Sequence, residues 1–262
     1  MHHLLTIIDK EWAEVFKNKI VFFTLVFMPL LFTALPLVSL HFMTGAMPEG
    51  ADAADVPEAF LLACGTLSAR DCLQIYVIDQ FMLLYMMMPL IIPITIAAYS
   101  VVGEKTTRSL EPLLATPITT ETLLAGKALA AVIPALAATW VCFGIFLLAL
   151  PLVGAGEAAR AHALGPTWLL GIFVAAPLMA VAAVNFALMV SSRVNDPRVA
   201  EQLAAVLIVP LLALFFAQII GFIILSPSLM LIMIAVLLVL DVALIYLGAR
   251  LFQRETILTR WR

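Results

Sequence analysis

Six apolar stretches, each long enough to cross a membrane as a helix, dominate this sequence of 262 residues. A transmembrane helix needs about 20 mainly apolar residues. The chain is 64% hydrophobic and 12% charged, whereas about a quarter of the residues of a soluble domain are charged. We therefore predict an all-α membrane protein of a single domain, residues 1–262. The predicted spans cover approximately residues 20–40, 80–102, 128–153, 167–190, 203–225 and 229–249.

Residues 1–19 precede the first span and have an amphipathic helical pattern. One face of the predicted helix carries apolar side chains and the rest of it carries charged ones. Such a pattern is typical of a helix that lies in the membrane interface. The apolar residues on the predicted face are Leu5, Ile8, Trp12, Val15 and Phe16.

The distribution of lysine and arginine predicts the orientation of the six spans. If the N-terminus is inside, the inner segments contain 12 of these residues and the outer segments contain 2. Cytoplasmic loops carry the excess of positive charge. We therefore expect a multi-pass protein of the plasma membrane with both termini in the cytoplasm. Residues 41–79 are then an acidic external loop, and residues 104–127 form a cytoplasmic segment.

The cytoplasmic segment 104–127 reads EKTTRSLEPLLATPITTETLLAGK and is unusually polar. Glu104 stands four residues before Arg108, and Arg108 stands three before Glu111, so their side chains can pair on a helix surface. Pro112 is tolerated only in the first turn of a helix. The sequence therefore predicts a helix that continues beyond the membrane, breaks near Glu111 and restarts as a short helix that Pro117 ends.

Leu110, Leu113 and Leu114 lie on one side of this short helix. A stripe of leucines in a cytoplasmic loop requires a surface to cover it. One interpretation is a docking site for another protein. The other is an ordinary loop whose leucines fold back onto the helical bundle.

The order of motifs in this segment resembles that of a known transporter family. E-K is followed by L-E-x-L-L-A-T-P and then by G-K, as in the type-2 export permeases of ATP-binding cassette (ABC) transporters. The six spans, the amphipathic N-terminus, the inner loop SSRVNDPRVAEQ and the C-terminal LFQRETIL extend the resemblance over the whole chain. Many members carry Gly-Thr where this chain has Arg108 and Ser109, which leaves the break point of the helix open.

The resemblance implies that residues 104–127 contain a coupling helix that docks on a cytoplasmic ABC ATPase subunit. The chain has no G-x-x-x-x-G-K-[ST] motif, because Ala128 follows Gly126 and Lys127. ATP and magnesium are therefore expected on the partner subunit, and no cofactor or metal is expected in this chain. The residues that the resemblance assigns to ATPase coupling are Glu104, Arg108, Leu110, Glu111, Leu113, Leu114 and Pro117.

In such permeases, the second and fifth spans of two protomers line the path of the substrate. The resemblance thus implies a dimer with a second copy or a homologous permease, within membrane lipids. It assigns the path to Met82, Met86 and Gln218. Thioethers also bind Cu(I), although methionines in an apolar helix are more often adaptable packing groups. Nothing in the sequence predicts a nucleic-acid partner.

Asp241 is the single acidic residue well inside a predicted span, and Asn185 and Gln218 are milder polar residues in the fourth and fifth spans. Asp241 is about 18 Å along the sixth helix at a rise of 1.5 Å per residue. A carboxyl group at that depth must be protonated, paired or in contact with water. It could serve a proton-linked step or form a salt bridge to the third or fourth span; we favour a hydrogen bond to Asn185 or to a serine.

Three cysteines are present. Cys64 and Cys72 flank CGTLSARDC in the predicted external loop and can form a disulfide if that loop faces an oxidising compartment. Cys142 lies in an apolar stretch and is expected to be a small core residue.

Two other classes of function fit the sequence less well than an export permease of unidentified substrate. A self-contained secondary transporter would have inverted repeats or several ionisable groups at the membrane midplane. An intramembrane aspartyl protease would need a second acid beside Asp241, and the spans contain none.

Overall fold

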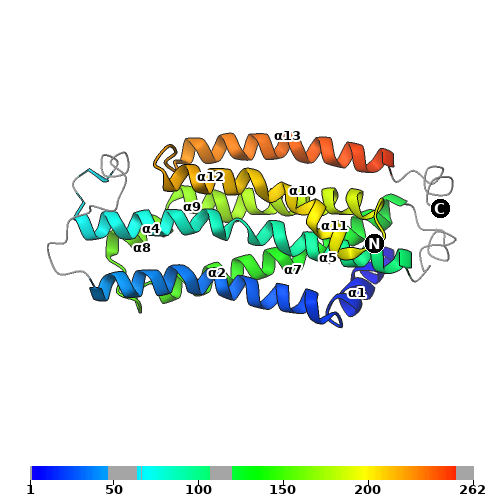
Figure 1. Ribbon diagram of the computed structural model, residues 1–262, viewed down its shortest axis with the longest axis horizontal. Helices are drawn as coiled ribbons and strands as arrows, with labels where there is room; N and C mark the ends of the chain where they lie inside the picture. Colours follow the sequence, from blue (N-terminus) through cyan, green and yellow to red (C-terminus); the bar gives the residue numbers. More distant parts are fainter. Residues whose placement is uncertain (1, 47–63, 66, 107–119, 252–262) are drawn as a thin grey trace.

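The computed structural model describes residues 2–46, 64–65, 67–106 and 120–251, and these residues form an all-helical bundle (Figure 1). The described residues contain six helical stretches that are long and apolar enough to cross a membrane. This confirms the predicted fold class and the number of spans. The stretches are Lys19–Met43, Ala69–Lys105, Thr122–Ala149, Glu157–Ser191, Pro197–Ile219 and Pro227–Leu251.

The N-terminal helix α1 (His2–Val15) lies at one end of the bundle and crosses the direction of α2 (Lys19–Ala46). The turn between them is capped by Asn18, whose side-chain oxygen accepts a hydrogen bond from the backbone of Ile20. The C-terminal ends of α5 and α13 lie at the same end of the bundle as α1. The sequence predicts that this end faces the cytoplasm, and it is called the inner end below; the opposite end is called the outer end.

The second span consists of two helices, α4 (Ala69–Tyr85) and α5 (Met88–Thr106). The break falls just before Pro89, which has no backbone N–H and is therefore tolerated in the first turn of α5. α4 begins 11 residues before the predicted start of this span at residue 80.

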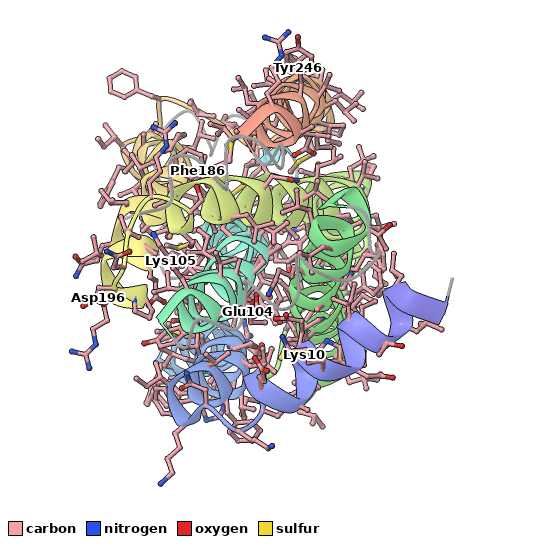
Figure 2. All side chains as sticks on the ribbon, turned by 90° about the vertical axis from the view of Figure 1, so that its right-hand side faces the viewer. Lys10, Glu104, Lys105, Phe186, Asp196 and Tyr246 are labelled. Carbon is pink, nitrogen blue, oxygen red and sulfur yellow. A yellow bond between two sulfur atoms is a disulfide. The ribbon has the colours of Figure 1, made fainter. Side chains whose placement is uncertain are left out.

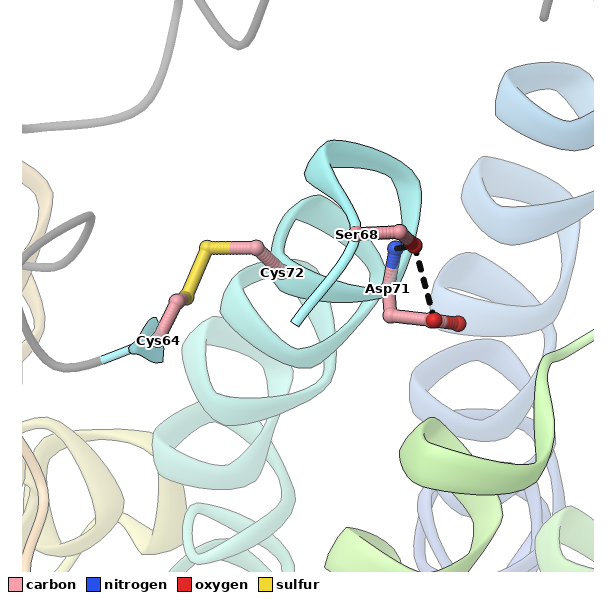
Figure 3. Close-up of a disulfide and its surroundings, with 4 residues drawn as sticks. All are labelled: Cys64, Ser68, Asp71 and Cys72. Carbon is pink, nitrogen blue, oxygen red and sulfur yellow. Dashed lines mark hydrogen bonds between the residues drawn. A yellow bond between two sulfur atoms is a disulfide. The ribbon is translucent and has the colours of Figure 1, made fainter. Parts of the chain in front are cut away.

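The predicted external loop 41–79 is therefore too long. α2 continues to Ala46 and residues 69–79 belong to α4, while residues 47–63 lie outside the described part of the chain. Asp79 was among the acidic residues that predicted a loop, but Asp79 and Gln74 are both buried on α4, which packs against α8 (Glu157–Ala163). Ser68 caps α4 by accepting a hydrogen bond from the backbone N–H of Asp71 (Figure 3).

The third span is α7 (Thr120–Ala149), which begins eight residues earlier than predicted. The fourth comprises α9 (Pro166–Leu170), a π-helical segment η1 (Gly171–Ala175) and α10 (Ala176–Ser191). The π segment precedes Pro177, which cannot donate the backbone hydrogen bond that would complete the preceding turn.

The fifth span comprises α11 (Pro197–Ala204), the 3₁₀ segment η2 (Ala205–Ile208) and α12 (Val209–Ile219). The sixth span is α13 (Pro227–Leu251). α5 and α10 pack together at the centre of the bundle, where buried alanines such as Ala97 and Ala183 allow a close approach. α2, α12 and α13 are peripheral and expose many apolar side chains, as expected of helices that contact lipid or another subunit.

Candidate functional site

A cluster of four charged side chains lies near the end of α5 and the start of α7, which contain the two described ends of residues 104–127. These residues are called the coupling segment below, after the role that the sequence predicts. Glu104 is in the last turn of α5, and Lys127 is in the second turn of α7. Lys10 and Glu11 come from α1. These four residues are called the four-charge cluster below. It joins three helices, and its most distant members in the sequence, Lys10 and Lys127, are 117 positions apart.

Lys127 is the centre of the four-charge cluster. Its ammonium Nζ lies 2.6 Å from Glu11 Oε1 and 2.8 Å from Glu104 Oε2. Lys10 contacts the other oxygen of Glu104 at 2.5 Å. Figure 2 shows Lys10 and Glu104 pointing toward each other between α1 and α5. Each carboxylate in the cluster thus has at least one ammonium partner.

The hydroxyl group of Ser100 completes this arrangement. It accepts a hydrogen bond of 2.8 Å from Lys127 Nζ and donates one of 2.5 Å to Glu11 Oε2. Ser100 lies four residues before Glu104, on the same side of α5. The backbone of α5 therefore supplies two neighbouring groups to the same cluster.

Burial makes these contacts strong determinants of structure. The exposed fractions of Glu11, Glu104 and Lys127 are 2%, 3% and 5%. Two acids and two bases balance each other, which offsets the large desolvation penalty of burying ions. Removing one partner would leave an uncompensated charge in the interior, a change that typically destabilises a protein by about 3–5 kcal/mol.

Lys10 is the most exposed member and lies outside the membrane-spanning segments. Partial burial lowers the pKa of its ammonium group, but the hydrogen bond and the charge of Glu104 outweigh burial, so that the pKa is raised above its ordinary value of 10.5. Lys10 therefore remains protonated at neutral pH and keeps its contact with Glu104.

A glycine allows α1 to approach α7 closely. A Cβ atom at Gly126 would lie 2.7 Å from Cγ2 of Ile7, which is too close for any other residue without a shift. The indole Nε1 of Trp12 also donates a hydrogen bond of 3.0 Å to the carbonyl oxygen of Ala130. The G-K motif at the end of the coupling segment thus combines a close helix contact with a charged partner.

The inner end of α5 is also held on its opposite side. Lys105 Nζ donates hydrogen bonds of 3.3 Å to the carbonyl oxygens of Ser192 and Val194, just after α10. Thr95 donates a hydrogen bond of 2.5 Å to Glu201 of α11. Lys105 and Glu104 therefore connect α5 to different neighbours (Figure 2).

Of the residues that the sequence assigned to coupling, the structure describes Glu104 and places it in the four-charge cluster. The others lie outside the described residues: Arg108, Leu110, Glu111, Leu113, Leu114 and Pro117. The sequence did not predict that Lys10 and Lys127 are partners of Glu104. The available signal was the presence of Glu104 and Lys127 at the two ends of the segment, each beside an apolar span.

The buried face of α1 overlaps the predicted apolar face in part. Ile8 and Val15 of that face are buried and Leu5 and Phe16 are exposed, while Ile7 and Glu11, which lie outside it, are also buried. A helical wheel groups apolar residues, but α1 buries a stripe that includes a glutamate because Lys127 and Ser100 supply its partners.

The residues predicted to line a path are not exposed in this conformation. Met82, Met86 and Gln218 are all buried within the chain. The methyl groups of Met82 and Met86 lie around Gly171 of the fourth span. A role for these residues in a substrate path stays a prediction, and it requires this packing to open.

The predicted hydrogen bond between Asp241 and Asn185 is not formed. The side chain of Asn185 donates instead to the carbonyl oxygen of Val181 in its own helix, at 2.8 Å. Asp241 is 5% exposed, and neither carboxyl oxygen has a hydrogen-bond or salt-bridge partner within the described part of the chain. The expectation of a paired Asp241 is therefore wrong for this structure.

The outer end of the bundle contains a disulfide and a set of polar contacts. The structure joins Cys64 to Cys72, with Cα atoms 5.7 Å apart (Figure 3). Cys142 is a buried free cysteine. His162 of α8 contacts the buried carboxylate of Asp79 at 2.7 Å. The contact between His162 and Asp79 attaches the α7–α9 connection to α4, and the disulfide attaches Cys64 to α4.

A model of the ABC-2 family transporter protein matches residues 5–234. The chain belongs to the ABC-2 transporter family. The match includes most of α1, both ends of the coupling segment, the first five spans and the beginning of α13. No curated protein matches the chain.

Membership of this family makes the chain a multi-pass membrane permease of an ABC transporter. The family also implies an ATPase partner. The resemblance inferred from E-K, L-E-x-L-L-A-T-P and G-K is thereby confirmed at the level of the family. In this ABC-2 permease, the four-charge cluster joins the two described ends of the coupling segment.

Proposed function

We propose that this ABC-2 permease exports its substrate across the plasma membrane, powered by a separate ATPase subunit that docks on the coupling segment. The observation that carries this proposal is the four-charge cluster. Glu104 and Lys127 connect the two ends of the segment to each other, and Lys10 and Glu11 connect both ends to α1.

A docked subunit that moves the coupling segment would move α5, α7 and α1 together. The buried ion pairs resist separation of the two ends because each separated charge would lack a partner in the interior. Lys105 and Thr95 extend the connection from α5 to the α10–α11 region. Movement at the inner end can therefore reach the central pair of spans, α5 and α10.

The proposal assigns ATP and magnesium to the partner subunit and leaves this chain without a catalytic role. It also includes a dimer with a second copy or a homologous permease, because one bundle exposes wide apolar faces on α2 and α12. Lipids cover the apolar surface that remains. The inner ends of α1 and α13 lie at one end of the bundle, which supports two cytoplasmic termini.

Docking is tested by replacing both Leu113 and Leu114 with aspartate and measuring how much ATPase subunit co-purifies with the full-length permease. We expect at least a tenfold loss, because two charges would enter an apolar contact. Leu67→Asp is the matched control, since Leu67 is an exposed leucine beside α4 at the outer end, and it should retain the subunit.

Association at wild-type strength in the double variant would contradict docking on this segment. Export is tested separately in inside-out vesicles that contain the permease and its ATPase subunit. ATP should drive accumulation inside these vesicles, whereas transport by the permease alone with an ion gradient would favour a secondary transporter.

A further inference from the structure

Asp241 lies on the buried face of the sixth span. This face packs mainly against α10, α9 and η1 of the fourth span. Asp241 is 14 residues from the first residue of α13, or about 21 Å at 1.5 Å per residue. It is thus well inside the apolar layer. The buried residues of this face are Met230, Ile234, Asp241, Leu244 and Gly248.

No charged partner is available to Asp241 from the elements packed against it. Residues 166–191, which form α9, η1 and α10, contain no ionisable side chain. On α13 itself the other ionisable groups are Tyr246 and Arg250, and these contact each other on the exposed side of the helix, with 4.4 Å between the guanidinium carbon and the ring centroid.

The other buried acids in the described residues differ from Asp241 in this respect. Glu11 and Glu104 each contact Lys127, and Asp79 contacts His162. Neither oxygen of Asp241 has a hydrogen-bond partner among these residues. An ionised carboxylate is strongly disfavoured in an apolar interior without a partner, whereas a neutral carboxylic acid is tolerated far better.

We propose that Asp241 is a proton-binding site that makes the packing of α13 on the fourth span dependent on protonation. In the packed arrangement the side chain is a neutral carboxylic acid. When α13 separates from α10 and water reaches the group, the acid releases its proton to water and becomes a carboxylate. Re-packing then requires the proton to return.

This proposal fixes the direction of the pH dependence. The packed state binds the proton more tightly than the separated or unfolded state, so the contribution of the α10–α13 contact is largest at low pH. This contribution decreases as pH rises above the ordinary pKa range of a carboxyl group. Ionisation of Asp241 then stabilises the separated state relative to the packed state.

Infrared spectroscopy of the full-length permease in lipid, labelled with carbon-13 at aspartate carboxyl groups, tests the protonation state directly. At neutral pH we expect the carbonyl stretching band of a protonated, labelled acid. Asp241→Asn and Asp241→Glu should both abolish this band, the latter because glutamate is unlabelled. Asp79→Asn is the matched control and should leave the band in place, since Asp79 has a partner in His162.

Absence of the band from the wild type, or its survival in Asp241→Glu, would overturn the proposal. A second measurement is the apparent Tm from about pH 6 to about pH 9. The wild type should lose at least about 3 °C more than Asp241→Asn over this range. Parallel curves for the two proteins would show that the packing does not depend on this proton.

Discussion

Glu104 and Lys127 are 23 positions apart in the sequence, yet their side chains meet at 2.8 Å across the two ends of the coupling segment. The same ammonium group contacts Glu11 of α1 at 2.6 Å. One lysine therefore connects three helices at the inner end of the bundle. The consequences can be tested by altering one partner at a time.

Replacing Lys127 with methionine should be strongly destabilising. The change keeps most of the side-chain volume but leaves Glu11 and Glu104 without their buried partner, so a loss of about 3–5 kcal/mol in the free energy of unfolding is expected. Thermal unfolding in detergent or lipid provides the measurement. Lys17→Met removes an exposed lysine from the same region and should change stability by less than about 0.5 kcal/mol.

A double-mutant cycle with Glu104→Gln and Lys127→Met measures the interaction energy between these two side chains separately from the other contributions of each residue. Because the two side chains are in contact, their effects should not add, and the double variant should be more stable than the sum predicts. Additive losses would show that Glu104 and Lys127 do not interact in the folded protein.

Gly126→Ala should weaken the contact between α1 and α7. The new methyl group would lie 2.7 Å from Cγ2 of Ile7, a β-branched side chain with little freedom to move. We expect a loss of about 1–3 kcal/mol from overpacking, measured by thermal unfolding. Combining Gly126→Ala with Ile7→Ala should relieve the closest contact and leave only the Cβ atom of residue 7, at 3.0 Å, so that the glycine substitution lowers stability less in that background.

Gly103→Ala is the matched control, because a Cβ atom there meets nothing within 4 Å and the residue is inside α5. Alanine in a helix interior is favoured over glycine by roughly 0.5–1 kcal/mol. An equal or larger loss at Gly103 than at Gly126 would argue against the close contact with Ile7.

The sequence predicted the parts of the fold that depend on hydropathy alone. Six apolar stretches predicted the six spans. The short helix predicted within the polar segment between the second and third spans lies outside the described residues and stays a prediction. The boundary of the second span was wrong because Gln74 and Asp79 were counted as loop residues. Their burial depends on α8, and composition carries no information about which later helix will cover them.

The sequence also did not predict which charged residues of the candidate site are partners of one another. Glu11 was one charge among several on an amphipathic helix, and only the packing of α1 against α7 brings it to Lys127. At Asn185 the sequence predicted a partner that the structure does not show, because Asn185 was expected to form a hydrogen bond with Asp241. A side chain that can bond to the carbonyl oxygen four residues earlier needs no partner from another helix.

Cys64 and Cys72 should be oxidised to one disulfide in the mature protein. The two cysteines are bonded in the structure beside the outer end of α4, where an oxidising exterior would favour the disulfide. Alkylation under denaturing conditions, followed by mass spectrometry, should modify Cys142 alone until a reductant is added. Alkylation of Cys64 and Cys72 without reductant would show that they are free thiols.

Lys10 should contribute to stability at neutral pH and lose its contribution in strong alkali. Its pKa is raised above 10.5 because the hydrogen bond and charge of Glu104 outweigh the effect of partial burial. A group whose pKa is higher in the folded state stabilises that state fully below the unfolded pKa, and this stabilisation disappears as pH rises through the folded pKa. The relevant window is therefore above about pH 10.5.

The size of this effect is limited by solvent, since the side chain of Lys10 is 38% exposed. We expect a contribution of less than about 1 kcal/mol. Unfolding curves from about pH 9 to about pH 12 should fall more steeply for the wild type than for Lys10→Met. Lys17→Met, which removes an exposed lysine of the same region, should follow the wild type. If Lys10→Met does so as well, the contact between Lys10 and Glu104 makes no contribution to stability.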